Sequence, residues 1–179
     1  QERSRTLISH HNAILTGRTG TVSENGFFVE EFNPADHQLV SSTKLRHSIM
    51  SLQVMDRCRV LAHGTSEYSV IDYCKDSTPR SQTYVINPTV VAHAGAYVGN
   101  ETFLFYEPNA GILRMQKGQR ARKIAPKISF TRSINYVAGQ AWFANNFNIW
   151  KVDPLSGAMQ KVFKKNYEFS GIISTFGYK

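Results

Sequence analysis

Several features on which well-known protein classes depend are scarce or missing in this sequence. Only two of the 179 residues are cysteines, Cys58 and Cys74, which is too few for a disulfide framework, and they lack metal-ligand spacing. No apolar run approaches the roughly 18 residues of a membrane-spanning helix, and the first residues lack the apolar segment of a signal peptide. We therefore expect neither a helical membrane protein nor a small disulfide-stapled domain.

Sequence motifs of catalysis are missing as well. HExxH, CxxC and GxSxG do not occur, and no pair of carboxylates at a useful spacing accompanies the histidines. The segment "LTGRTGTV", residues 15–22, has two glycines but falls short of a phosphate-binding loop. We therefore expect no enzymatic activity, no metal ion and no cofactor.

Helical periodicity is nearly absent, and this absence points to the fold class. The apolar residues come in short β-branched and aromatic runs separated by Gly, Asn, Asp and Pro. A hydrophobic content of 41% with 12% aromatic residues is typical of a globular chain that can build a core. The pattern predicts an all-β globular protein.

What the sequence does contain is a repeated turn. Each copy follows an aromatic-rich strand and combines proline with an acidic residue or Asn. Proline presets φ near −65°, the acid or Asn accepts hydrogen bonds from turn amides, and glycine supplies a positive φ. The copies lie about 40 residues apart on average. They are "FNPAD" (32–36), "YCKDSTP" (73–79), "YEPNAG" (106–111) and "VDPLSG" (152–157).

Repeats of about 40–45 residues, each a four-stranded meander, are typical of propeller blades. We therefore predict an all-β fold, a β-propeller of about four four-stranded blades or part of a larger propeller; a β-sandwich or a closed barrel is the alternative. The innermost strands are expected at residues 48–55, 88–93 and 127–133. The predicted blades of this single domain or fragment, 1–179, are residues 6–48, 49–87, 88–126 and 127–168, with an incomplete fifth unit at 169–179.

Acidic residues are missing from one long internal stretch. Between Glu107 and Asp153 there is no Asp or Glu but eight Lys or Arg, which equals the formal net charge of the whole chain, +8. By the blade assignment, residues 116–126 ("QKGQRARKIAP") connect the third and fourth units, and such connections lie at a surface. Because like charges repel, this composition predicts a negatively charged partner. The candidate polyanion-binding residues are Arg114, Lys117, Arg120, Arg122, Lys123, Lys127 and Arg132.

RNA is one ligand that fits this stretch, because aromatic residues follow the charges. In single-stranded RNA sites, bases stack on aromatic rings while Lys and Arg pair with phosphates. Two alternatives stay open: a solvated basic loop over an ordinary aromatic core, or pairing of the charges with Glu101 or Glu107. The aromatic residues concerned are Phe130, Tyr136, Trp142, Phe143, Phe147 and Trp150.

The two cysteines flank a predicted hairpin, so their strands could lie side by side. We interpret Cys58 and Cys74 as small buried apolar side chains, and the sequence leaves open whether they are bonded. Asn100 begins N-E-T, a permitted glycosylation sequon. The sequon and the basic stretch together leave an extracellular location open.

Through its four turns, nearly the whole chain resembles a divergent WD40-type propeller, without the Gly-His and Trp-Asp pair of the commonest repeat. It also resembles, more narrowly, the N-terminal propeller of the catalytic subunit of the poly(A)-nuclease deadenylation complex. The segments that carry this likeness are "YVGNETFLFYEPNAG", "VAGQAWFANNFNIWKVDPLSG" and "FSGIISTFGYK". The resemblance implies a scaffold that docks a partner subunit near poly(A) RNA, with the nuclease in another domain, and it assigns no functional residue.

Three functions are therefore expected. The leading one is a non-enzymatic scaffold that binds protein partners, since a propeller offers a rigid platform with loops on two faces. Its location would be cytoplasmic or nuclear, and secretion is not excluded. The alternatives are RNA or other polyanion binding through residues 114–132, and an extracellular glycan-binding propeller.

Overall fold

The computed structural model describes residues 4–10, 12–87, 89–128, 133–144 and 148–164, with the backbone alone at 4–7. These residues form strands and turns and include no helix, so the all-β prediction is confirmed and no membrane-spanning helix is found among them. The chain divides into two units, Gln1–Val90 and Val91–Lys179. Each unit holds two four-stranded antiparallel sheets, an arrangement compatible with four propeller blades.

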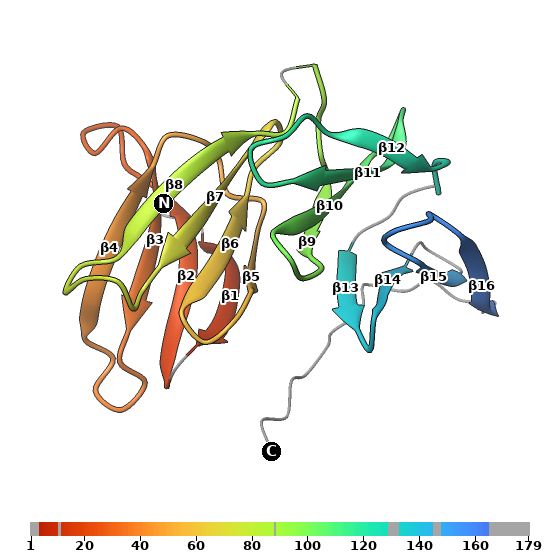
Figure 1. Cartoon of the computed structure of the whole chain (residues 1–179). Coiled ribbons are helices and arrows are strands. Elements are labelled where there is room, and N and C mark those ends of the chain that lie inside the picture. Colours follow the sequence, from red (N-terminus) through yellow and green to blue (C-terminus); the bar gives the residue numbers. More distant parts are fainter. Residues whose placement is uncertain (1–3, 11, 88, 129–132, 145–147, 165–179) are drawn as a thin grey trace. The chain divides into compact units, whose positions relative to one another are not determined.

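The first unit contains two meanders, in which neighbours in the chain are neighbours in the sheet (Figure 1). The first sheet consists of β1 (Ser4–His10), β2 (Ala13–Thr19), β3 (Phe27–Phe32) and β4 (Leu39–Leu45). The second consists of β5 (Ser51–Val54), β6 (Arg59–His63), β7 (Glu67–Asp72) and β8 (Arg80–Val85).

One hydrophobic core joins the two sheets of the first unit. Alternate residues of β2 are buried, as expected for a strand with one face on a core. The first strands of the two sheets, β1 and β5, lie against each other. Each fully buried aliphatic side chain stabilises the folded state by about 1.5–3 kcal/mol relative to an exposed one. The core residues are Leu15, Val29 and Leu45 from the first sheet, and Ile49, Leu52, Val60, Ala62 and Ile71 from the second sheet and the connection before it.

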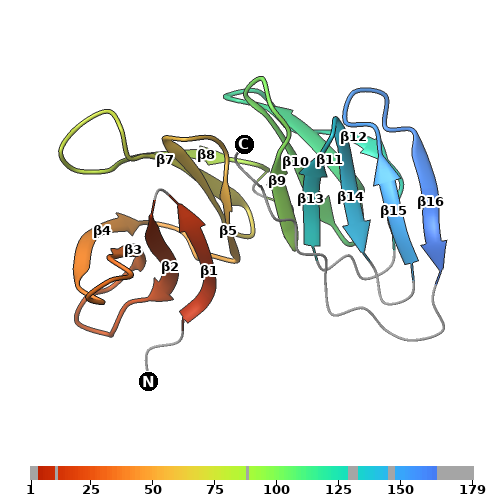
Figure 2. The same ribbon diagram turned by 90° about the horizontal axis from the view of Figure 1, so that it is seen from below.

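The second unit repeats this plan, and Figure 2 shows the strands of its last sheet side by side in chain order. Its first sheet consists of β9 (Ala94–Tyr97), β10 (Thr102–Glu107), β11 (Gly111–Gln116) and β12 (Arg122–Ala125). Its second consists of β13 (Ser133–Val137), β14 (Gln140–Ala144), β15 (Asn148–Val152) and β16 (Met159–Lys164).

The core of the second unit lies between its two sheets, and the first strands β9 and β13 are again in contact. Every residue of β10 is buried, whereas the outer strand β16 is largely exposed. Buried residues of this core include Ala96, Leu104, Tyr106 and Ile112 from the β9–β12 sheet, with Ile134, Ala141, Phe143 and Val152 from the β13–β16 sheet.

The third sheet is out of step with the repeated turn. In the other three sheets the turn joins the third and fourth strands, but "YEPNAG" joins the second and third, β10 and β11. The turn at Pro108 therefore occurs one strand earlier in its sheet than the other turns do. This explains why it follows the turn at Asp76 after fewer residues than the average spacing and precedes the turn at Pro154 by more. Two predictions are wrong for this reason: the first strand of the third sheet is Ala94–Tyr97, not residues 88–93, and the supposed connection 116–126 contains strand β12.

The four sheets cover residues 4–45, 51–85, 94–125 and 133–164. The fifth unit predicted at residues 169–179 lies outside the described residues. So do residues 129–132 of the innermost strand predicted at 127–133, while the described first strand of the fourth sheet is Ser133–Val137.

Candidate anion-binding surface and pockets

The predicted basic residues lie on β11, on β12 and around the turn between these strands. Arg114 on β11 stands directly opposite Arg122 on β12, and Leu113 stands opposite Lys123. Because β12 is the outer strand of its sheet, Arg122 and Lys123 are both exposed. Arg132 lies outside the described residues. We call the four exposed cations Arg120, Arg122, Lys123 and Lys127 the basic edge.

Only a small part of this charge is neutralised within the described chain. Lys117 forms an ion pair with Glu101 at 3.2 Å, as the alternative interpretation expected. Glu107 does not take part, because its carboxylate accepts hydrogen bonds from the backbone N–H groups of Asn109 and Ala110 in its own turn. The four residues of the basic edge have no carboxylate partner among the described residues.

Strand β12 is held in place from the fourth sheet. Gly157, in the turn between β15 and β16, has a φ of 76° and lies so close to the carbonyl oxygen of Ile124 that a Cβ atom would overlap it. Ile124 also packs against the core of the second unit. The basic edge is therefore supported by backbone packing beneath it, and its long side chains remain in solvent.

The aromatic residues that suggested RNA stacking are largely used elsewhere. Phe143 is fully buried in the core, and Tyr136 and Trp150 pack against that core. The ammonium group of Lys161 lies 4.9 Å from the ring centroid of Trp150. Trp142 on β14 is partly exposed and does not belong to that core, and Phe130 and Phe147 lie outside the described residues. Of the six aromatic residues, three are thus used by the core and one, Trp142, is a described ring that the core does not use.

A pocket of about 320 Å³ lies within the second unit, next to Arg114. Its walls come from the turn after β9, from β11 and from the turn that opens at Asp153. Polar groups are contributed by Asn100, Gln116 and Tyr136, in addition to Arg114 and Asp153. The pocket therefore combines one cation, one anion and two amides.

The two charged groups of this pocket differ in how they are satisfied. The guanidinium of Arg114 is half-buried, its Nε is shielded from solvent, and it has no partner among the described residues. Asp153 instead closes its own turn, since its Oδ1 accepts hydrogen bonds from the N–H groups of Leu155 and Ser156 and from the Ser156 hydroxyl. These bonds, the Ser156 N–H foremost, hold the pKa of Asp153 below its usual value.

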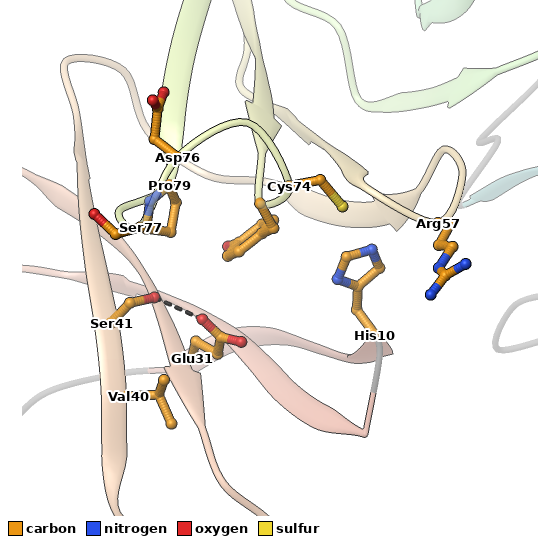
Figure 3. A pocket seen from close by; sticks show the side chains of 10 residues that line it. His10, Glu31, Val40, Ser41, Arg57, Cys74, Asp76, Ser77 and Pro79 are labelled. Carbon is orange, nitrogen blue, oxygen red and sulfur yellow. Dashed lines mark hydrogen bonds between the residues drawn. The ribbon is translucent and has the colours of Figure 1, made fainter.

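A second pocket, of about 330 Å³, lies in the first unit (Figure 3). The side chain of His10 points into it, and the Ser41 hydroxyl donates a hydrogen bond to Glu31 at 2.7 Å. The Tyr73 hydroxyl is buried without a partner among the described residues, and burial, with a smaller contribution from Glu31, raises its pKa. The Arg57 guanidinium adds a positive charge to a lining that already carries two carboxylates. With both signs present, this pocket has no clear charge preference.

The interpretation of the cysteines as separate buried side chains is wrong. Cys58 and Cys74 form a disulfide with a Cα–Cα distance of 5.2 Å, and Cys74 is exposed. They close the open end of the β6–β7 hairpin, where the Tyr73 N–H donates to the Cys58 carbonyl at 2.8 Å. The expectation that their strands lie side by side is confirmed, and pairing of the strands brought the two thiols within bonding distance.

Three histidines are buried in the first unit: His10, which lines the pocket described above, His47 and His63. The Nδ1 of His47 donates to the Ser48 carbonyl at 2.8 Å, and its Nε2 lies 2.7 Å from the Ser69 hydroxyl. Burial lowers the pKa of His47, and it lowers that of His63 to about 4. Neither lines a described pocket, so we interpret both as structural. No group of three His, Cys, Asp or Glu side chains suited to a metal ion occurs in the described ranges.

The Asn100 sequon lies at the exposed turn between β9 and β10, where the Thr102 hydroxyl donates to the Asn100 carbonyl at 3.2 Å. Asn100 has a φ of 48°, the left-handed conformation that Asn tolerates better than most residues. Attachment of a glycan there stays a prediction.

Comparison with known proteins adds no relative: no protein-family model matches the chain, and no curated protein matches it.

Proposed function

We propose that this chain is a non-enzymatic propeller-type module that binds an acidic polysaccharide through its basic edge. One observation carries the proposal. Arg120, Arg122, Lys123 and Lys127 are exposed around a single outer strand and have no carboxylate partner among the described residues. Arg122 and Lys123 project to opposite faces of the sheet, so the four cations surround the outer edge of β12. Uncompensated cations around one strand attract a polyanion and cost folding stability through mutual repulsion when none is bound.

Protection of an edge strand is the competing explanation, since proteins often place Lys on outer strands to prevent unwanted strand pairing. The other outer strands of this chain show how many cations are present where only protection against strand pairing is needed. Strand β4 has Lys44 alone, and the single cation of β8, Arg80, is paired with Asp76. Strand β16 has two, Lys161 and Lys164. Strand β12 itself has two as well, Arg122 and Lys123. The basic edge differs from β16 in its two flanking cations, Arg120 and Lys127, which make four exposed cations within eight residues.

Two observations favour a polysaccharide over RNA as the polyanion. The Cys58–Cys74 disulfide is of a kind that persists in oxidising, mostly extracellular surroundings, where sulfated and carboxylated glycans occur. Sites for single-stranded RNA depend on several exposed aromatic rings, but Phe143 is buried, Tyr136 and Trp150 pack on the core, and Trp142 alone of the described candidates is partly exposed outside it. A polysaccharide needs only the charges.

The test compares two triple variants that lower the net charge equally. In the first, Arg120, Arg122 and Lys123 are changed to Ser; in the second, three cations of other outer strands, Lys44, Lys161 and Lys164, are changed to Ser. Binding to heparin, a sulfated polysaccharide, is measured by calorimetry over a range of salt concentrations. The wild type should bind with micromolar affinity or better, with log affinity falling linearly as log salt rises. The first variant should lose most of this affinity, and the control variant little.

Three results would contradict the proposal. They are a flat salt response of the wild type, equal losses in the two triple variants, or tighter binding of a single-stranded RNA of matched charge than of heparin. The last result would favour the RNA alternative instead.

The finer family assignment is also part of this proposal. Four four-stranded sheets support a propeller, while the WD40-type subfamily and the likeness to the propeller of the deadenylation complex rest on the turn motifs alone. A protein-docking role in the cytoplasm or nucleus stays a prediction.

A further inference from the structure

We propose that the pocket beside Arg114 binds a single acidic sugar of the uronic-acid type, with its carboxylate on the Arg114 guanidinium and its ring hydroxyls toward Asp153 and Asn100. The choice of an acidic sugar as the ligand class rests on the proposed function, but the residues that line this pocket are not those of the basic edge. At about 320 Å³ the pocket is near the lower limit of cavities that hold small molecules, which suits one sugar unit.

The state of Arg114 is the first reason. A half-buried guanidinium normally has acceptors, because an arginine removed from water loses several strong hydrogen bonds. Here the Nε of Arg114 is shielded, and none of the described residues accepts from the side chain. A carboxylate is the acceptor that the planar, forked guanidinium fits best, through two parallel hydrogen bonds.

The turn that opens at Asp153, which also lines the pocket, restricts the class of ligand further. Asp153 is kept ionised by the N–H groups of its own turn, so it repels a ligand that is negative throughout. A carboxylate can instead accept hydrogen bonds from hydroxyl groups. The amides of Asn100 and Gln116 offer both donors and acceptors to such groups. A uronic acid has one carboxylate for Arg114 and several hydroxyl groups for the other polar side chains of the pocket. Phosphate or sulfate alone would form hydrogen bonds with Arg114 but offer no hydroxyl groups to Asp153.

The position of the pocket connects it with the basic edge. Arg114 and Arg122 are paired residues on adjacent antiparallel strands, so their Cα atoms lie about 4.5–5.5 Å apart. Arg114 lines the pocket and Arg122 is exposed on the outer strand. A polysaccharide with one acidic unit in the pocket would therefore reach the basic edge with its next units.

Nuclear magnetic resonance titration of the wild type, produced without a glycan at Asn100, tests the proposal directly. Glucuronate should shift the backbone amide signals of Gly99 and Gly139, which line the pocket. Glucose, which has the hydroxyls without the carboxylate, and sulfate, which has charge without hydroxyls, should each bind at least about 10-fold more weakly. Equal binding of glucose would overturn the role of Arg114, and equal binding of sulfate would overturn the sugar assignment.

Two single variants separate this inference from the proposed function. Arg114→Gln should weaken glucuronate binding roughly 10- to 100-fold, because a charge-assisted bidentate contact is lost. Arg122→Gln should leave glucuronate affinity within about threefold and weaken heparin, since exposed charges act mainly through long-range attraction. Shifts of the wild-type amides report on the pocket even if Arg114→Gln fails to fold.

Failures of the two proposals look different. If heparin binds and depends on the basic edge while glucuronate shifts no pocket amide, the pocket assignment is wrong and the proposed function stands. If glucuronate binds at the pocket while heparin binding does not respond to the Ser variant of the basic edge, the proposed function is wrong and the pocket stands.

Discussion

The Nε2 of His47 lies 2.7 Å from the hydroxyl oxygen of Ser69, 22 residues further along the chain. The Ser48 carbonyl can only accept, so the Nδ1 of His47 carries the proton and Nε2 of the neutral ring accepts from Ser69. The Ser69 oxygen lies in turn 2.8 Å from the Thr83 hydroxyl. This chain of hydrogen bonds ties the connection before β5 to strands β7 and β8.

Replacing Ser69 by Ala should destabilise the fold, because it leaves the Nε2 of a buried imidazole without its donor. The expected loss in the free energy of unfolding is about 1–3 kcal/mol. Thr83→Val is the matched control, since it removes the outer hydrogen bond and leaves the His47–Ser69 pair. Urea denaturation of both variants measures the difference. A Thr83→Val loss as large as that of Ser69→Ala would mean that the His47 contact has no special weight.

Acid should destabilise the protein before most carboxylates titrate. The unfolded His63 has a pKa near 6.5 and the folded one about 4, so the unfolded state binds more protons between these values. The stability is therefore complete above pH 6.5 and falls as the pH is lowered toward 4. The loss from His63 is on the order of 3 kcal/mol, and His47 shifts in the same direction.

Unfolding free energies at pH 7.5, 6, 5 and 4 measure this dependence. His63→Asn cannot titrate at this position and should make the curve less steep above about pH 4.5, with the contribution of His47 remaining. A wild-type curve that stays level between pH 6.5 and 4.5 would contradict the neutral, buried state of both rings.

Reduction of the Cys58–Cys74 bond should destabilise the first unit. The two cysteines are 16 residues apart, and opening a loop of this length costs about 3 kcal/mol through the entropy of the unfolded chain. Thermal melts with and without reductant, and of a Cys58→Ser, Cys74→Ser double variant, measure the effect. The reductant should leave the melt of the double variant unchanged. Equal melting temperatures of oxidised and reduced wild type would contradict the prediction.

Gly157 and Gly118 offer a matched pair, because their φ angles are 76° and 74°. At Gly118 a Cβ would meet nothing within 4 Å, so Gly118→Ala costs only the left-handed conformation, about 1–2 kcal/mol. At Gly157 the Cβ would overlap the Ile124 carbonyl oxygen, which adds roughly 1–3 kcal/mol of overpacking. Gly157→Ala should also weaken heparin binding, because it displaces β12. Similar stabilities of the two variants would show that the β15–β16 turn does not press on β12.

Variants of Lys117 and Lys123 compare how a paired and an unpaired lysine contribute to heparin binding. Lys123→Gln should reduce the salt slope of heparin binding by roughly one contact, since Lys123 is exposed and unpaired in the described chain. Lys117→Gln should change it less, because Lys117 already forms an ion pair with Glu101. Calorimetric titrations at four salt concentrations give both slopes. A larger effect from Lys117 would place the binding surface on the turn and not on β12.

The all-β class and the place of the charge excess could be predicted from the sequence. Alternating and β-branched runs are local patterns of the sequence. The stretch without Asp or Glu between Glu107 and Asp153 is a property of the composition and needs no structure to be recognised. The chemistry of the turns was local too: Asp153 accepts from the amides of its turn, as its spacing predicts. Nearest neighbours in the chain decide these features, so the sequence alone determined them.

Tertiary structure decided which strand each segment became and which side chains meet. The turn at Pro108 has the same chemistry as the others, yet it joins the second and third strands, because sheet position depends on pairing between β9, β10 and β11 and not on the turn itself. The Cys58–Cys74 bond, the Arg114–Arg122 pair and the pocket beside Arg114 all follow from that strand pairing and from packing between sheets. The register of the paired strands and the packing between sheets bring these residues together, and neither is specified by the local sequence pattern.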